Sequence, residues 1–440
     1  MASLVPDISL APYLERARQA EPIPISGRVV RTVGLLVESR GPHARVGDIC
    51  ELERSGSGGR LLLEVVGFRD GLLQTVPLGP TTGIRPGDRL VARQSSASIP
   101  VGDALLGRVI DGLGRPIDGH AEPMLAGRYA LHPKPLNPLE RDPIVAPIGT
   151  GIRAVDALLT CGRGQRVGLF GGSGVGKSTL LGMMARGTAA DIAVIALVGE
   201  RGREVRSFLE HDLGPEGLAR SVVVVSTSDS PPLVRLRAAF TATAIAEYFR
   251  DQGRSVLLMM DSVTRFAMAQ REVGLAAGEP PTAKGYPPSV FALLPGLLER
   301  AGNVQRRGSI TGIYTVLVEG DDQTEPVADS VRAILDGHIV LSRDLAQRNH
   351  YPAIDVLHSV SRTMPDVTSV DHRTRAGQVR EWLATLRDSE DLISVGAYVE
   401  GSNARIEDAL ARRDAIDAFL RQSADALSTF DEAIQGLQAI

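Results

Sequence analysis

The residues most able to do chemistry lie in segment 171–179, which reads GGSGVGKST. Its first eight residues fit the pattern G-x-x-x-x-G-K-[ST], between the apolar run QRVGLF and the helical run TLLGMMAR. In such a loop, backbone N–H groups surround phosphate oxygens, and the following helix directs its N-terminus at the anion. The segment therefore predicts a phosphate-binding loop made by Gly171, Gly172, Ser173, Gly174, Val175, Gly176, Lys177, Ser178 and Thr179.

Two side chains of this loop have chemistry of their own. Lys177 is expected to bridge the terminal phosphates of a nucleotide, and Ser178 is expected to ligate Mg²⁺. Of the 48 basic residues in the chain only Lys134, Lys177 and Lys284 are lysine. A sequence that otherwise prefers arginine but keeps lysine here indicates that the loop needs a compact ammonium group.

Two carboxylates follow apolar runs that read as strands. Asp261 ends the run SVLLMMD, where a carboxylate near Mg²⁺ is expected in a phosphate-loop protein. Glu200 follows IAVIALVG and should emerge at the same carboxyl edge of a parallel sheet, where ligands bind. There it can orient and polarise a water that attacks the terminal phosphate, although a solvated Glu at a helix start fits this segment too.

Arg362 is the remaining candidate, in the segment PAIDVLHSVSRTM. It can act in trans by stabilising transition-state charge on a neighbour's phosphate, or it can be a surface or salt-bridged arginine. The eight histidines form no metal pair at helical spacing, and the sequence holds no nucleophile-elbow triad.

Five apolar or helical runs from QRVGLFG to SVLLMMD alternate as strand and helix, which predicts an α/β fold with a parallel sheet covered on both faces. Short β-rich runs separated by glycine and proline turns in 26–95 predict a small β-barrel. Residues 366–440 have amphipathic helical patterns. Within 1–25, residues 9–20 read as a short helix, either packed on its own domain or in contact with a partner or another subunit.

The composition of the chain disfavours several classes of function. The chain has 440 residues and a net charge of −4, so no basic excess favours a nucleic acid partner. Phe68 is the sole aromatic residue in 26–95, which disfavours a barrel that stacks single-stranded RNA. Cys50 and Cys161 have no ligand-spaced neighbours, so neither a disulfide framework nor a zinc site is expected. No apolar run has the ~20 residues of a spanning helix and no secretory signal is visible, which favours the cytoplasm.

Taken together, these segments resemble the catalytic subunits of rotary ATPases, and PAIDVLHSVS is similar to their signature segment. More narrowly, RGQRVGLFGGSGVGKSTLLGMMAR, ALVGERGREVRSFLE and DSVTRFAMAQREVGLAAGEPPTAKGYPPSVF resemble the ATPases of bacterial type III export over residues 25–440. LLVESRGPHARVGDICEL and GSITGIYTVLVEGDD look more like the flagellar export ATPases than the injectisome ones.

The resemblance implies a barrel at 26–95, a RecA-like ATPase domain at 96–365 and a helical domain at 366–440. It implies ATP and Mg²⁺, with Glu200 activating water, Arg201 and Arg265 near the terminal phosphate, Asp261 on the metal side and Arg362 donated across a subunit interface. The chain departs from the rotary catalytic subunits at one point, since those subunits stack adenine on an aromatic soon after the SR pair. Because residues 364–377 contain no aromatic, loose discrimination among purine triphosphates is expected.

The implied assembly is a homo-hexameric ring that energises flagellar protein export at the inner membrane, to which it binds peripherally. Implied partners are a stator-like regulator at the N-terminus, a central stalk in the ring, the membrane proteins of the export gate, and export substrates and chaperones at the C-terminal domain. The alternatives are an injectisome ATPase, an ATP synthase catalytic subunit, whose dense acidic rotor loop the stretch GAYVEGSNARIEDALARR lacks, and an RNA translocase.

Overall fold

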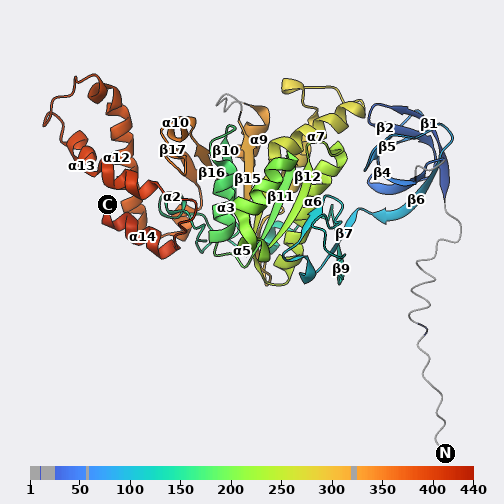
Figure 1. Ribbon diagram of the computed structural model, residues 1–440, viewed down its shortest axis with the longest axis horizontal. Coiled ribbons are helices and arrows are strands. Elements are labelled where there is room, and N and C mark those ends of the chain that lie inside the picture. Colours follow the sequence, from blue (N-terminus) through green and yellow to red (C-terminus); the bar gives the residue numbers. More distant parts are fainter. Residues whose placement is uncertain (1–9, 11–24, 56–58, 319–324) are drawn as a thin grey trace, which may run out of the picture. The chain divides into compact units, whose positions relative to one another are not determined.

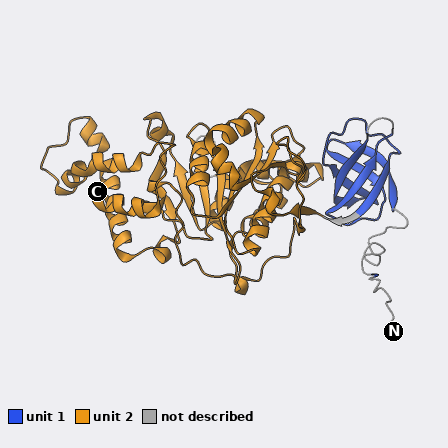
Figure 2. Ribbon diagram, turned by 60° about the horizontal axis from the view of Figure 1, so that its bottom comes forward, with its two compact units in different colours: residues 1–96 blue, residues 97–440 orange. Residues whose placement is uncertain are grey.

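The computed structural model describes residue 10 and residues 25–55, 59–318 and 325–440. The chain divides into two compact units, residues 1–96 and residues 97–440, which Figure 2 shows in two colours. The helix expected over residues 9–20 lies outside the described residues, apart from Leu10.

The first unit is a closed antiparallel barrel in the strand order β1-β2-β5-β4-β3-β6. The apolar core of the barrel comes from every second residue of a strand, as in the pairs Cys50 and Leu52 or Leu61 and Leu63, because successive side chains point to opposite faces. Phe68 is exposed. The barrel confirms the sequence prediction, and its strands are β1 (Ser26–Val33), β2 (Leu36–Arg40), β3 (Asp48–Glu53), β4 (Arg60–Arg69), β5 (Leu72–Pro77) and β6 (Arg89–Ser96).

The second unit is built on a nine-stranded sheet in the order β17-β16-β10-β15-β13-β11-β12-β8, with β14 paired to β15. Neighbours are parallel except at β16–β17 and β14–β15. The strands are β8 (Val109–Asp111), β10 (Arg166–Gly171), β11 (Ile192–Glu200), β12 (Ser221–Thr227), β13 (Ser255–Asp261), β14 (Gly302–Asn303), β15 (Ser309–Leu317), β16 (Gly337–Leu341) and β17 (Ile354–Ser361).

The central strands are apolar because helices cover the sheet (Figure 1). Every residue of β13 is buried, as is every residue of β11 before Glu200. Helix α6 (Pro232–Asp251) packs against β11, β12 and β13, and α7 (Val263–Ala276) packs against β15 and β11. These contacts confirm the predicted α/β architecture with a parallel sheet.

Helices and short turns connect the strands of the sheet. The helices of this region are α2 (Arg153–Leu158), α3 (Lys177–Gly187), α4 (Gly202–Ser207), α5 (Gly214–Ala219), α6 (Pro232–Asp251), α7 (Val263–Ala276), α8 (Pro288–Leu298), α9 (Pro326–Ile334), α10 (Arg343–Gln347) and α11 (Met364–Val367). A π-helical turn, η3 (Phe208–Leu213), joins α4 to α5, and β7 (Ser98–Val101) pairs with β9 (Gly127–Ala130). Single 3₁₀ turns are η1 (Asp103–Leu105), η2 (Pro138–Glu140) and η4 (Ala283–Gly285).

The C-terminal part is helical and belongs to the same compact unit as the sheet. Helix α12 (Val370–Ser394) packs against α13 (Ala404–Leu420), and α14 (Phe430–Ala439) packs against α2. Buried apolar residues such as Val379, Ile416 and Leu437 join the core of the central domain. Among the described residues, no helix has the length and apolar character needed to cross a membrane.

Candidate functional site

The predicted phosphate loop joins the end of β10 to the start of α3. Gly174 and Gly176 have φ of 80° and 85°, a left-handed conformation that favours glycine. Gly176 is the N-cap of α3 and Lys177 is its first residue, so the free N–H groups of the helix face the loop. Ser178 and Thr179 are exposed in the first turn, where hydroxyl groups are available to a bound ligand.

Lys177 and Asp261 meet at the carboxyl edge of the sheet. The Lys177 Nζ atom lies 3.2 Å from Asp261 Oδ1, and both side chains are largely buried. Asp261 Oδ1 also accepts a hydrogen bond from Thr315 Oγ1 at 2.7 Å. Thr315 is on β15, the strand between β10 and β13, so this strand holds the carboxylate in place. Sequence analysis missed both β15 and Thr315, although SITGIYTVL is a β-rich run.

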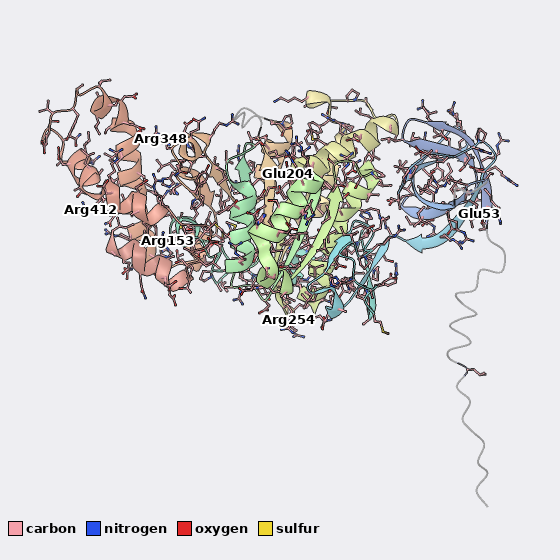
Figure 3. The ribbon with its side chains drawn as sticks, viewed as in Figure 1. Glu53, Arg153, Glu204, Arg254, Arg348 and Arg412 are labelled. Atoms are coloured by element: carbon pink, nitrogen blue, oxygen red, sulfur yellow. The ribbon has the colours of Figure 1, made fainter. Side chains whose placement is uncertain are left out.

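Glu200 ends β11, beside the strand that carries Asp261. Burial, the negative charge of Asp261 and a side-chain hydrogen bond with Glu204 raise the pKa of Glu200 to about 7, while Lys177 and Arg265 oppose the rise. Glu204 lies near this carboxyl edge of the central domain (Figure 3). A carboxyl group that ionises near neutral pH is suited to hold or accept a proton from water.

The two arginines expected near the terminal phosphate flank Glu200. Arg201 is exposed, with Nη1 3.6 Å from Glu204 Oε1. The stem of Arg265 packs over Gly199, where an added Cβ would stand 3.0 Å from Arg265 Cβ. The Nε atom of Arg265 is buried without a hydrogen-bond partner. An unsatisfied guanidinium N–H at this position fits an anionic ligand, because burying it without a partner is costly.

Two residues that sequence analysis missed lie against the loop. The ring of Tyr351 approaches Gly176, where an added Cβ would stand 3.3 Å from Tyr351 Cε1, and 41% of this residue is exposed. Arg343 Nη2 would stand 2.9 Å from a Cβ on Gly172. An exposed aromatic face at the loop is a stacking surface for a base. Tyr351 precedes Arg362 in the chain, whereas the aromatic of the related rotary subunits was expected after that arginine, in residues 364–377.

Arg362 lies away from the other candidates. It follows β17, whose last residue, Ser361, pairs with Gly337 at the start of β16. The Ser361 side chain also contacts Gln165, just before β10 begins. Arg362 is therefore at the amino edge of the sheet, and the length of β10 separates it from the phosphate loop of its own chain.

The site fits a nucleotide and Mg²⁺ by the chemistry of its donors. The loop N–H groups, Lys177 and Arg265 favour phosphate oxygens. No group of three or more His, Cys, Asp or Glu in the described segments could hold a metal without help. Mg²⁺ needs no such cage, since it is held by one or two protein oxygens together with substrate phosphates. Ser178 and Asp261 would supply those oxygens.

Comparison with known families agrees with this architecture. Residues 151–361 match the ATP synthase alpha/beta family, nucleotide-binding domain, and residues 29–93 match the beta-barrel domain of that family. Residues 368–439 match the T3SS EscN ATPase C-terminal domain. The three matches follow the order of barrel, sheet and helices in the structure.

Individual proteins are similar over almost the whole chain. The flagellum-specific ATP synthase of Bacillus subtilis (strain 168) is 52% identical over 415 residues, covering 94% of each chain. The assembled ATPase EscN from the enteropathogenic E. coli type III secretion system has a TM-score of 0.88 at 48% identity, covering 94% of this chain and 99% of that one. EscN in complex with its central stalk EscO has a TM-score of 0.86 at 47% identity, covering 94% and 99%. The chain therefore belongs to the ATP synthase alpha/beta family, together with the flagellum-specific ATP synthases and the type III secretion ATPases.

Proposed function

We propose that this ATPase hydrolyses Mg²⁺-ATP as a homo-hexameric ring and that turnover energises export of flagellar proteins. The observation that carries the proposal is the meeting of Lys177, Asp261 and Glu200 at the carboxyl edge of one sheet, in a chain of this family. The names of the flagellar and secretion relatives support the biological setting.

The geometry supports the following catalytic roles. The loop N–H groups and Lys177 hold the β- and γ-phosphates, and Glu200 orients and polarises the attacking water. Arg201 and Arg265 balance charge near the γ-phosphate. Mg²⁺ held by Ser178 and Asp261 would supply charge neutralisation between the phosphates. Tyr351 stacks on the adenine from the side of Gly176, which replaces the expectation of a site without an aromatic.

Arg362 serves the site of a neighbouring subunit. Its place at the amino edge of the sheet supports this role, because its side chain cannot reach past β10 to its own phosphate loop. A chain that holds a phosphate loop at one edge and the completing arginine at the other is suited to a closed ring of identical subunits.

The wider assembly is proposed by analogy. The stalk-bound structure of EscN supports a central stalk protein as a partner of this ring. We also propose a stator-like regulator at the N-terminus, membrane proteins of the export gate, chaperones and export substrates at the helical domain, and peripheral attachment to the inner membrane. No nucleic acid partner is proposed. Phe68 is the sole aromatic of the barrel strands, which is too few for stacking single-stranded RNA.

A complementation experiment tests the flagellar assignment. The chain is expressed in a Bacillus subtilis strain that lacks its flagellum-specific ATP synthase, with Lys177→Ala as the matched control. We expect restored swimming and restored export of flagellin with the wild-type chain and neither with the control. Restored export of an injectisome substrate in a secretion ATPase mutant, without any flagellar rescue, would favour the secretion alternative.

A further inference from the structure

Residues 421–428 (RQSADALS) connect α13 to α14. They contact the last turn of the phosphate-loop helix α3, and they contact Tyr351, whose ring lies against Gly176 at the start of that helix. We call these eight residues the crossover segment. Gln422 lies near its start and is 6% exposed. A buried amide in a connection between helices is unusual, because each of its polar atoms needs a partner.

The Gln422 amide has those partners. Its Nε2 donates to the carbonyl oxygen of Gly151 at 2.8 Å and to that of Ala426 at 2.5 Å. Its Oε1 accepts from the backbone N–H of Arg153 at 2.9 Å. Both donors of the amide are thus used, which fixes the orientation of the side chain and the place of its backbone.

The backbone of Gln422 contacts Tyr351, a residue beside the nucleotide site. Its N–H donates to the carbonyl oxygen of Tyr351 at 2.9 Å. Tyr351 places its ring against Gly176, at the entrance of α3. The backbone that carries this ring is therefore held by a hydrogen bond from a residue of the helical domain.

The crossover segment also reaches the far end of α3. Arg186, in the last turn of that helix, donates through Nη2 to the carbonyl oxygen of Ala424 at 2.7 Å. Gly187 packs against Gly151 so closely that a Cβ on either would lie under 3 Å from the other's Cα. A Cβ on Gly187 would also meet Leu427 Cδ2 at 3.1 Å. The crossover segment thus contacts the last turn of α3 directly and the start of α3 through Tyr351.

We propose that Gln422 is a positioning residue of the nucleotide site, which sets the place of Tyr351 and couples occupancy of the base to the helical domain. The proposal rests on the nucleotide site described above. It acts on the base alone, because Gln422 contacts neither the loop nor Lys177. Loss of the Gln422 amide should therefore weaken recognition of the base while leaving recognition of the phosphates intact.

Equilibrium binding of two ligands tests this. ATP carries a base and inorganic triphosphate does not, and both are titrated with Mg²⁺ by calorimetry into the full chain. We expect Gln422→Leu to weaken ATP binding about tenfold, which is within what stacking of one base on an aromatic contributes, and to change triphosphate binding less than about twofold. In a Tyr351→Ala background the same change should cost less than about twofold, because coupled residues do not add.

Two further variants keep the outcome decisive. Arg186→Gln removes a tie of the same crossover segment at the end of α3 far from Tyr351, so it should leave the preference for ATP over triphosphate unchanged. Gln422→Glu keeps the acceptor for Arg153 but sets an oxygen against two carbonyls, so it should lower ATP binding as the leucine does. Equal losses for both ligands, or a full effect in the Tyr351→Ala background, would overturn the proposal. Lys177→Ala should lose both ligands, which tests the nucleotide site independently of Gln422.

Discussion

The two edges of the central sheet differ in how their charged residues are held. At the carboxyl edge, Lys177, Asp261 and Thr315 form a connected set of contacts, and Glu200 lies beside them. At the amino edge, Arg362 is exposed and is held by its backbone N–H, which donates to the carbonyl oxygen of Asp336. In the described part of the chain its guanidinium has no hydrogen-bond or ion-pair partner.

This difference supports the proposal that one subunit holds parts of two sites. β10 has six residues, which at ~3.3 Å per residue separate the edges by about 20 Å. A guanidinium cannot cover that distance across a packed sheet. The buried set at the carboxyl edge fits a bound nucleotide, and the exposed arginine at the amino edge supports the proposed contact with a neighbouring subunit.

Removing the lysine at the carboxyl edge should have the largest effect. Lys177→Ala removes the sole ammonium of the loop and leaves Asp261 without its cationic partner. We expect ATP hydrolysis at background level and weakened nucleotide binding, measured by phosphate release and by calorimetry. A folded variant that turns over at a near-normal rate would contradict the assigned site.

Removing the arginine at the amino edge should separate binding from turnover. Arg362→Ala leaves the phosphate loop of its own chain untouched, so nucleotide binding should be retained. Turnover should fall about 10³-fold, as when a trans-acting arginine is removed from related phosphoryl-transfer systems. An unchanged rate in the assembled protein would mean that Arg362 is a surface residue.

Glu200→Gln tests whether Glu200, at the carboxyl edge, polarises the attacking water. The amide preserves the shape of the side chain and removes the charge that polarises water. We expect binding to persist and turnover to fall about 10²-fold, which is the lower range for a lost general base. Parallel loss of binding and turnover would instead indicate that Glu200 has a structural role.

The pH dependence of the enzyme should follow Glu200. Because burial and Asp261 raise the pKa of this carboxyl to about 7, its ionised, active form accumulates as pH rises through that value. kcat/KM should therefore fall about tenfold per pH unit below pH 7 and level off above it, a profile that reports the free enzyme. Glu200→Gln should flatten this profile, and a wild-type profile that is flat from pH 5.5 to 8 would contradict the assignment.

The residues of the carboxyl edge were unequally predictable from the sequence. Lys177 is marked by the glycine pattern around it and Asp261 by its place at the end of the run SVLLMMD, and the structure brings both residues together. The neighbour of Asp261, Thr315, has no such signal, because pairing between β13 and β15 is set by the fold and not by spacing. Tyr351 was missed for the same reason, since its contact with Gly176 spans 175 residues.

The fold was easier to predict from the sequence than the contacts between side chains. Continuous apolar runs predicted the buried strands, and the turn-rich texture of 26–95 predicted the barrel. The edge strands β8 and β17, and β16 next to β17, were not identified, because they are short or only partly buried and their periodicity is weak. The sequence pattern of the crossover segment did not predict its contacts with Tyr351 and Arg186, because these contacts are set by the tertiary fold.

Mixing two inactive variants tests the division of the site between subunits most directly. Lys177→Ala subunits lack a working loop but keep Arg362, and Arg362→Ala subunits keep the loop but lack the arginine. In a mixed ring, a Lys177→Ala subunit can complete the site of an Arg362→Ala neighbour, so the ATPase rate should exceed that of both parents. The recovery should increase with protein concentration, because the completed site exists in the assembled ring alone. If subunit exchange is complete and no mixing ratio exceeds the parents, Arg362 does not act across an interface and the account of the two edges is wrong.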